Sequence, residues 1–267
     1  METNTSAQNT VIKAIVLDIE GTTCPVSFVS QTLFPYAQKQ LAKTISGPDR
    51  ERKITNIIQE VITEWKEDTD NTSKELLLLT NNQTTPSDKD VIRYLDYLIQ
   101  CDRKSTALKE LQGIIWEQGY TNGELQSPLF ADVIPALDNW KKQGLSIAVY
   151  SSGSVKAQQL LYSNTQRGNI SDRFSQWFDT RTGPKLEAKS YTKISELLKL
   201  KPQSIVFVSD HPGECDAAQM SGMQTRFCLR EGNPYRRSGR HPVIESLSEI
   251  EVVNEATVKP SSPKTVP

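Results

Sequence analysis

The sequence is poor in the residues from which many hydrolytic and metal sites are built. Among 267 residues there are only 2 His and 4 Cys, and neither a Gly-x-Ser-x-Gly nor a His-Glu-x-x-His motif occurs. A Ser-His-Asp triad or a zinc site is therefore poorly supported. The Walker A and Gly-x-Gly-x-x-Gly sequences are absent as well, which argues against a nucleotide cofactor.

Charge of one sign and long apolar runs are also lacking. Lys and Arg number 31 against 32 Asp and Glu, a net charge of -1, so the basic surplus that nucleic-acid binding needs is missing. No run approaches the roughly 18 apolar residues of a membrane span, and the first ten residues lack the basic and apolar regions of a secretory signal. We expect a cytoplasmic protein with no nucleic-acid and no membrane partner. A nuclear location stays open for a eukaryotic source, because the Arg236-Arg237 pair is too short to decide.

The four cysteines lie far apart, at Cys24, Cys101, Cys215 and Cys228, with no Cys-x-x-Cys pair. Scattered thiols in a cytoplasmic chain of this length are typical of reduced core residues. We predict four free structural thiols, with a metal or redox role as the alternative.

Strand and helix patterns alternate over much of the chain. Val11–Leu17 is almost entirely apolar and predicts a buried strand, and Ser146–Tyr150 and Ser204–Val208 have the length of buried parallel strands. Asp132 would cap the first of the later helices, and Gly144 would end it. The helical patterns cover Asp132–Gln143, Val155–Leu161, Tyr191–Leu198 and Glu214–Met220. This alternation predicts an α/β fold, a doubly wound parallel sheet with helices on both faces.

The segment after the first strand has a different pattern. Leu33–Leu41 is amphipathic, and a polar run, Thr80–Ser87, predicts a loop. Helical i, i+3, i+4 spacing of apolar residues recurs in three further stretches, Ile54–Trp65, Val91–Ile99 and Leu108–Ile115. The segment therefore predicts about four helices and no strand.

These patterns together predict two domains. Residues 11–27 and 128–254 form an α/β catalytic core, and residues 28–127 form a helical bundle inserted into it. The polar ends, 1–10 and 255–267, predict disordered tails, because such segments cannot bury enough apolar surface to fold.

Polar and charged side chains gather where the three predicted strands end. Ligands of an open parallel sheet bind at the carboxyl ends of its strands. Lys185 lies in a loop between the second and third strands. The other residues are Asp18 and Glu20 after the first strand, Ser151, Ser152, Gly153 and Ser154 after the second, and Ser209, Asp210 and Glu214 after the third. The topology predicts that one crevice receives them all.

The carboxylates of this set suit a metal-assisted reaction. Asp18 and Glu20 are two residues apart on an extended segment, so their side chains share a face. With Asp210 they would repel one another unless a cation neutralised them, and oxygen ligands favour Mg²⁺. Asp18 would then be the nucleophile toward a phosphoryl group. Glu20 would give a proton to the leaving oxygen and later deprotonate the attacking water.

The remaining residues suit a phosphoryl group. Ser151 and the amides of Ser152 and Gly153 lie in a strand-to-helix turn, where backbone donors and a helix N-terminus hold phosphate oxygens. Lys185 would stabilise the charge on those oxygens and on Asp18 in the transition state. The set is complete for phosphoryl transfer through an aspartyl phosphate.

Each residue also has an ordinary structural interpretation. Asp18 could be a turn residue, Lys185 a solvated surface lysine, and Ser154 a helix cap, which we favour for it. Glu214 fits a first-turn helix carboxylate and a residue beside the metal equally well. We expect a structural place for His211. The conjunction of residues at three strand ends is what favours catalysis.

The sequence resembles the haloacid-dehalogenase-like phosphatases, whose core is Rossmann-like, in four motifs. These are Val16-Leu-Asp18-Ile-Glu20-Gly-Thr-Thr, Val149-Tyr-Ser151-Ser152-Gly-Ser, Lys185 followed by Ser190-Tyr191, and Val208-Ser-Asp210 with Glu214. The Glu two residues after the nucleophile, with Leu33-Phe-Pro-Tyr36 and the stretch from Asp102 to Gly113, is similar to the enolase-phosphatases of methionine salvage, the acireductone synthases. The resemblance runs from about Val11 to Leu247.

That resemblance implies a two-step reaction with Mg²⁺ as cofactor, one per chain. The substrate is 2,3-diketo-5-methylthiopentyl-1-phosphate, which is enolised and then dephosphorylated to the acireductone 1,2-dihydroxy-3-keto-5-methylthiopentene. The helical insertion corresponds to a cap that closes over the substrate. The base for enolisation stays open between Glu20 and a cap residue. The implied roles are catalysis by Asp18, Glu20 and Lys185, substrate binding by Ser151, Ser152 and Lys185, and metal binding by Asp18, Glu20 and Asp210.

Two rival functions remain open. One is another capped phosphatase of the superfamily, acting on a small sugar or amino-acid phosphate, and Glu20 and the cap sequence weigh against it. The other is a catalytically silent phosphometabolite-binding protein, against which the presence of Asp18, Lys185 and Asp210 weighs. We expect a monomer, because no helix shows a surplus apolar stripe.

Overall fold

The computed structural model of this chain describes residues 11–48, 50–80, 85–101, 103 and 105–252. The chain divides into two units, residues 1–26 with 127–267 and residues 27–126. The predicted tails, 1–10 and 255–267, lie outside the described residues, as do residues 81–84 of the predicted loop and two residues of the motif from Asp102 to Gly113.

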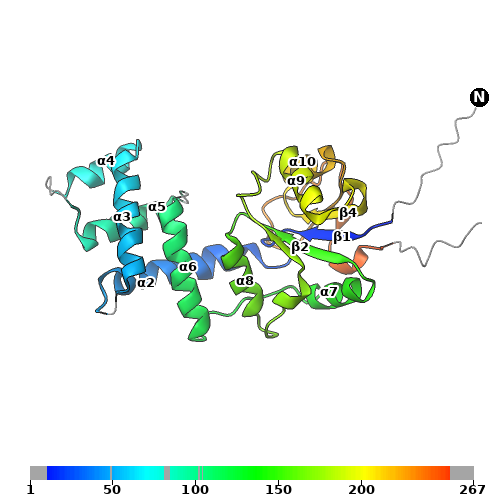
Figure 1. The fold of residues 1–267 in the computed structure, drawn as a ribbon, viewed down its shortest axis with the longest axis horizontal. Helices are drawn as coiled ribbons and strands as arrows, with labels where there is room; N and C mark the ends of the chain where they lie inside the picture. The colour runs from blue at the N-terminus through cyan, green and yellow to red at the C-terminus, as the bar shows by residue number, and fades with distance from the viewer. Residues whose placement is uncertain (1–10, 49, 81–84, 102, 104, 253–267) are drawn as a thin grey trace, which may run out of the picture. The chain divides into compact units, whose positions relative to one another are not determined.

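The first unit is built on a parallel sheet (Figure 1). Over the described residues its strand order is β3-β2-β1-β4-β5-β6, and every neighbouring pair is parallel. The strands are β1 (Ala14–Leu17), β2 (Ser146–Tyr150), β3 (Gln176–Phe178), β4 (Ile205–Ser209), β5 (Gln224–Cys228) and β6 (Val243–Ile244). All four residues of β1 are fully buried, because a strand paired on both edges and covered on both faces must be apolar.

Helices cover both faces of this sheet, so the predicted doubly wound fold is confirmed. On one face, Tyr191 and Ile194 of α9 and Ala218 of α10 pack with Val16 and Phe207 of the sheet. The helices α7 and α8 lie on the other face (Figure 1). The helices of this unit are α7 (Val133–Lys142), α8 (Val155–Ser163), α9 (Ala188–Leu198) and α10 (Pro212–Met220), with short 3₁₀ turns at η2 (Ser171–Arg173), η3 (Pro202–Ser204) and η4 (Leu247–Glu249).

The three predicted strands are present as β1, β2 and β4, and three others were not predicted. β3 has three residues and β6 has two, too few for an apolar pattern to stand out. β5 carries Gln224 and Arg226 on half-buried positions, so it does not read as a continuous apolar run.

Asp132 is the N-cap residue of α7 as predicted, but only by its position. Asp132 precedes the helix but makes no side-chain hydrogen bond to its N-terminus. Its Oδ2 accepts hydrogen bonds from the Leu247 N–H at 2.6 Å and from Arg230 Nη2 at 2.8 Å. The carboxylate therefore ties the start of α7 to η4. Gly144, with a φ of 77°, follows the end of the helix as predicted.

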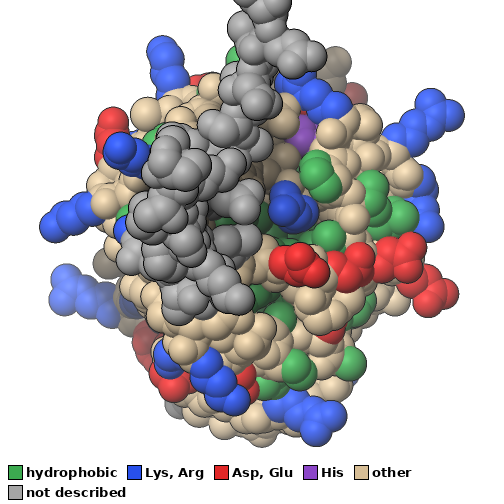
Figure 2. All heavy atoms as spheres, turned by 90° about the vertical axis from the view of Figure 1, so that its right-hand side faces the viewer, with side chains coloured by type: hydrophobic (Ala, Val, Ile, Leu, Met, Phe, Trp, Pro, Cys, Tyr) green, Lys and Arg blue, Asp and Glu red, His purple; other side chains and the backbone are tan. Residues whose placement is uncertain are grey.

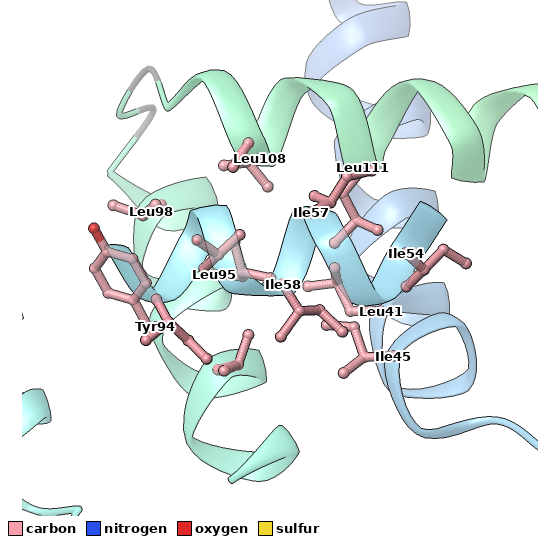
Figure 3. Packing of buried hydrophobic residues seen from close by; sticks show 14 of the residues in the cluster. Leu41, Ile45, Ile54, Ile57, Ile58, Tyr94, Leu95, Leu98, Leu108 and Leu111 are labelled. Carbon is pink, nitrogen blue, oxygen red and sulfur yellow. The ribbon is translucent and has the colours of Figure 1, made fainter. Parts of the chain in front are cut away.

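The second unit is helical, and Figure 3 shows part of its core. Apolar residues of α2, α3, α5 and α6, among them Leu41, Ile58, Leu95 and Leu111, meet in one buried cluster. The helical spacing from Ile54 to Trp65 is confirmed, since every apolar residue in it is buried. The helices of this part of the chain are α1 (Val26–Phe28), a π-helical turn η1 (Val29–Leu33), α2 (Phe34–Ser46), α3 (Arg52–Glu67), α4 (Asn71–Leu78), α5 (Asp88–Gln100) and α6 (Thr106–Thr121).

The predicted number of helices is wrong, because α4 lies in a stretch with no apolar spacing. Its one buried residue is Ser73. The Asp70 side chain accepts a hydrogen bond from the Ser73 N–H at 2.9 Å, and Trp65 Nε1 donates to the Ser73 carbonyl at 2.9 Å. End capping, the contact with Trp65 and the packing of the partly buried Leu76 and Leu77 against the core cluster hold this helix.

The cysteines follow the sequence analysis in part. All four cysteines are free, and Cys24, Cys215 and Cys228 are buried as predicted, but Cys101 is exposed at the end of α5. None of the described helices has the length and hydrophobicity to cross a membrane. On the face in Figure 2, basic and acidic side chains of the described residues are interspersed, without a continuous basic area.

Candidate active site

Three neighbouring strands deliver polar side chains to one edge of the sheet. Asp18 directly follows β1, and its N–H donates to the Val208 carbonyl of β4 at 2.9 Å. Ser151 directly follows β2, and Asp210 directly follows β4. Because β1 pairs with β2 on one side and β4 on the other, Asp18 stands between Ser151 and Asp210 at the carboxyl edge.

Lys185 bridges two carboxylates at this edge. Its Nζ lies 2.6 Å from Asp18 Oδ1 and 2.7 Å from Glu214 Oε2, and the three side chains are only 9–11% exposed. Burial disfavours the charged lysine, but attraction to Asp18 and Glu214 outweighs it and raises the pKa of Lys185 above its ordinary value. Lys185 is therefore a fixed cation beside one oxygen of Asp18, and not a solvated surface lysine.

The loop that carries Lys185 is held by three hydroxyl groups. Tyr150 donates to the Gly183 carbonyl at 2.8 Å, Ser190 to the Pro184 carbonyl at 2.7 Å, and Tyr191 to the Lys185 carbonyl at 2.7 Å. Lys185 Nζ also lies 5.7 Å from the centre of the Tyr150 ring. Three consecutive carbonyls are thus fixed by the sheet and α9, which holds the ammonium group in place.

Glu214, whose role the sequence analysis left open, lies in the site. Besides the ion pair with Lys185, its Oε2 accepts a hydrogen bond from Ser209 Oγ at 2.8 Å. The His211 ring caps α10, as Nδ1 accepts from the N–H groups of Gly213 at 3.1 Å and Glu214 at 3.4 Å. The signal in the sequence is spacing, since a residue four after Asp210 falls in the first turn of the following helix.

The site holds more acidic groups than its one lysine can neutralise. Burial and the charges of Asp18 and Glu214 raise the pKa of Asp210 to about 7. Burial and the charge of Asp18 likewise raise the pKa of Glu214 to about 7, although Lys185 opposes the rise. Among the described residues, the Asp210 carboxylate has no hydrogen-bond donor or ion-pair partner. A proton or a cation is what such a group requires.

Glu20 is coupled to the site by charge. It lies half-buried in the turn after Asp18 and pairs with Cys24 in an isolated bridge. Burial, and then the charge of Glu20, raise the pKa of Cys24 to about 12, and Glu20 also contributes to the raised pKa of Asp210.

The serine turn after β2 is ordered by its own hydrogen bonds. Ser151 is buried, and its Oγ accepts from the Gly153 N–H at 3.2 Å. Ser152 is exposed. Ser154 Oγ accepts from the Ala157 N–H at 3.3 Å and so caps α8, which confirms the structural interpretation of that residue. The Ser151 hydroxyl keeps its own proton for a ligand.

The oxygen donors of the site fit a divalent cation such as Mg²⁺. Within the described ranges, no three His, Cys, Asp or Glu side chains form a group that could hold a metal by themselves. Gly21, with a φ of 70°, is closely approached by two oxygens, since an added Cβ would lie 2.2 Å from Asp210 Oδ2 and 2.9 Å from Asn233 Oδ1, and that Asn233 oxygen is buried without a partner. Mg²⁺ takes one or two carboxylates and completes its shell with neutral oxygens, waters and phosphate. The sequence analysis included Gly21 only as part of the first motif and did not single out Asn233.

Comparison with known proteins agrees with this chemistry. The family model of haloacid dehalogenase-like hydrolases matches residues 12–222. An enolase-phosphatase E1 from Synechococcus sp. (strain WH7803) is 65% identical over 242 residues, covering 91% of this chain and 100% of the relative. Another, from Synechococcus sp. (strain CC9605), is 50% identical over 88% of this chain and 95% of its own length. The solved structure of the UTR4 protein from Saccharomyces cerevisiae is 29% identical with a TM-score of 0.71, covering 90% of this chain and 100% of that one.

Proposed function

The chain belongs to the haloacid dehalogenase-like hydrolase family, and from this premise we propose that it is an enolase-phosphatase of methionine salvage. It enolises 2,3-diketo-5-methylthiopentyl-1-phosphate and then dephosphorylates it to the acireductone 1,2-dihydroxy-3-keto-5-methylthiopentene. The observation that supports the phosphatase step most is the buried ion pair of Asp18 with Lys185, at 2.6 Å, at the carboxyl edge of the sheet, and the substrate is inferred from the enolase-phosphatase relatives.

Asp18 is the nucleophile of the phosphatase step. Lys185 contacts its Oδ1, which orients the carboxylate and leaves Oδ2 to attack the phosphorus. The aspartyl phosphate that forms places additional negative charge beside Lys185, which stabilises it more strongly than it stabilises the free site. Water then attacks the phosphorus, and inorganic phosphate leaves.

The phosphoryl group is bound by Ser151, Ser152 and Lys185. The buried Ser151 hydroxyl donates to a phosphoryl oxygen, Ser152 contributes from the same turn, and α8 begins directly behind them. Glu20 donates a proton to the leaving enol oxygen and removes one from the attacking water. This acid–base role suits a carboxyl group that lies half-buried in the turn after the nucleophile.

One Mg²⁺ per chain would be held by Asp18, Glu20 and Asp210. When bound it supplies positive charge, which offsets the acidic excess of the site and favours both the phosphoryl-transfer and the enolate charge. The Asp210 carboxylate, buried without a donor in the described chain, is the group that most needs this charge.

The remaining assignments concern the enolisation base and the setting of the reaction. Glu20 or a residue of the helical segment 28–127 removes the carbon-bound proton. That segment acts as a cap over the substrate, and the core formed by 11–27 and 128–254 carries the catalytic residues. We place the enzyme in the cytoplasm as a monomer that binds a small phosphorylated substrate. The two relatives described are bacterial, so a nuclear location is not proposed.

The direct test follows both half-reactions on the diketone phosphate. Phosphate release and enediol absorbance are measured with Mg²⁺ and with EDTA, for wild type, Asp18→Asn and Glu20→Gln. Asp172→Asn, at a carboxylate that is 75% exposed, is the matched control. We expect Mg²⁺-dependent release in wild type and control, with the enediol appearing first, and at least a 1,000-fold loss of release in Asp18→Asn, roughly 4 kcal/mol of barrier.

Other outcomes would redirect the assignment. Retained enolisation in Glu20→Gln would move the base to the helical segment. Release from a generic phosphate ester but not from the diketone phosphate would keep the phosphatase and reject methionine salvage. Binding without turnover of either would favour the silent binding protein.

A further inference from the structure

Asn233 has a buried amide side chain whose nitrogen is hydrogen-bonded and whose oxygen is not. It lies in the segment after β5 and is 6% exposed. Its Nδ2 donates to the Gly21 carbonyl at 2.9 Å and to the Cys228 carbonyl at 3.2 Å. Two carbonyl acceptors fix the orientation of the amide, because a flipped group would place oxygen against oxygen. Its Oδ1 is therefore held facing away from them, and it has no partner.

The unsatisfied oxygen and an unsatisfied carboxylate both lie close to Gly21. Around Gly21, the position of a missing Cβ is 2.2 Å from Asp210 Oδ2 and 2.9 Å from Asn233 Oδ1. Both atoms are acceptors, and neither receives a hydrogen bond from a described residue. Leaving a buried acceptor unpaired costs about 1–3 kcal/mol. Two acceptors that converge on one turn indicate that a cation or its bound water completes the arrangement.

We propose that Asn233 contributes a neutral oxygen to the Mg²⁺ site beside Asp210. This inference rests on the Mg²⁺ dependence of the proposed function. Mg²⁺ rarely uses an all-carboxylate cage, and a neutral amide oxygen adds to its shell without adding repulsion between the carboxylates. The assignment also accounts for the need for glycine at position 21, since any side chain there would separate Asp210 from Asn233.

The test measures Mg²⁺ binding directly, by isothermal titration calorimetry of the full chain without substrate. Asn233→Ala should raise the Kd for Mg²⁺ about tenfold, as expected for about 1.4 kcal/mol of lost interaction. Thr22→Val is the first control, because it removes another buried oxygen without a partner from the adjoining residue. Its Kd should stay within twofold of wild type.

A second control separates a ligand role from a role in holding the turn. Arg230 Nη2 donates to the Thr22 carbonyl at 3.2 Å, as Asn233 does to that of Gly21, yet it offers no oxygen to a cation. Arg230→Ala should lower the melting temperature and change the Kd less than twofold. An equal rise of Kd in Arg230→Ala and Asn233→Ala would overturn the proposal, as would an unchanged Kd in folded Asn233→Ala.

If Asn233→Ala does not fold, Asn233→Ser replaces it under the same criteria. Serine keeps a polar hydroxyl group at this position and lacks the amide oxygen. Wild type that binds no Mg²⁺ overturns the inference and the metal part of the proposed function together. Parallel phosphate-release assays distinguish that outcome from a failure of the phosphatase assignment itself.

Discussion

Lys185 is the residue whose removal tests the electrostatics of this site most directly. Its Nζ contacts Asp18 Oδ1 at 2.6 Å and Glu214 Oε2 at 2.7 Å, so these two oxygens are at most 5.3 Å apart. Two negative charges about 5 Å apart repel by about 3 kcal/mol at an effective dielectric constant of about 20. We predict that Lys185→Met lowers the free energy of unfolding at pH 8 by about 3–5 kcal/mol, as loss of one partner from a buried pair does.

The repulsion between Asp18 and Glu214 can also be removed by neutralising Glu214, which tests whether this repulsion causes the loss of stability. In the double variant Lys185→Met/Glu214→Gln the repulsion between Asp18 and Glu214 is gone, and about 3 kcal/mol of the loss should be recovered. Urea unfolding followed by circular dichroism in EDTA measures both variants. Lys141→Met is the control, because that lysine is 48% exposed and 4.0 Å from its partner, and loss of such a pair costs about 0–1 kcal/mol.

Activity and stability should separate in this series. Phosphate release should be lost in the single and the double variant alike, because the catalytic cation is missing from both, whereas stability returns in the double variant. A loss below about 1 kcal/mol for Lys185→Met, or a double variant no more stable than the single one, would refute the role of Lys185 as the charge that holds two buried carboxylates together.

Three further predictions concern the surroundings of this pair. Because the pKa of Asp210 is raised to about 7, the folded state binds more protons than the unfolded state between about pH 4 and 7. The melting temperature in EDTA should therefore fall as the pH rises through this window. In Asp210→Asn the melting temperature should fall less over the same window. Tyr191→Phe removes the hydrogen bond to the Lys185 carbonyl and should slow phosphate release about fivefold, for about 1 kcal/mol of positioning energy; an unchanged rate would dismiss that hydroxyl as a positioning group. Gly21→Ala should cost about 2–4 kcal/mol in urea unfolding, since its Cβ would lie 2.2 Å from Asp210 Oδ2, whereas Gly123→Ala, at a similar φ with nothing within 4 Å, should cost about 1 kcal/mol; equal losses would contradict the close approach.

The local sequence pattern was sufficient to predict those segments whose residue types are set by the burial of the segment itself. β1, β2 and β4 are apolar because they are covered on both faces and paired on both sides, so their apolar runs identify them. The helix from Ile54 to Trp65 can be identified from the spacing of its buried apolar residues. The polar residues that follow these strands could also be predicted to lie together, because the carboxyl ends of parallel strands meet at one edge of the sheet.

Local pattern failed where a residue's partner is distant in sequence. Asp132 has the position of a helix cap, yet it binds Leu247, 115 residues away. α4 has no apolar spacing and is held by capping, by Trp65 and by contacts of Leu76 and Leu77 with the core of the helical unit.

The sequence by itself therefore determined the three central strands of the sheet, its flanking helices and the set of polar residues at the strand ends. Only the tertiary structure decided that Lys185 reaches across 167 residues to Asp18 and also holds Glu214, and that Asn233 faces Asp210 over Gly21. Apolar periodicity is a property of neighbouring residues, and any local stretch displays it. Charge pairing and the close approach of backbone to side chain depend on distances between segments, which are fixed only when the chain has packed.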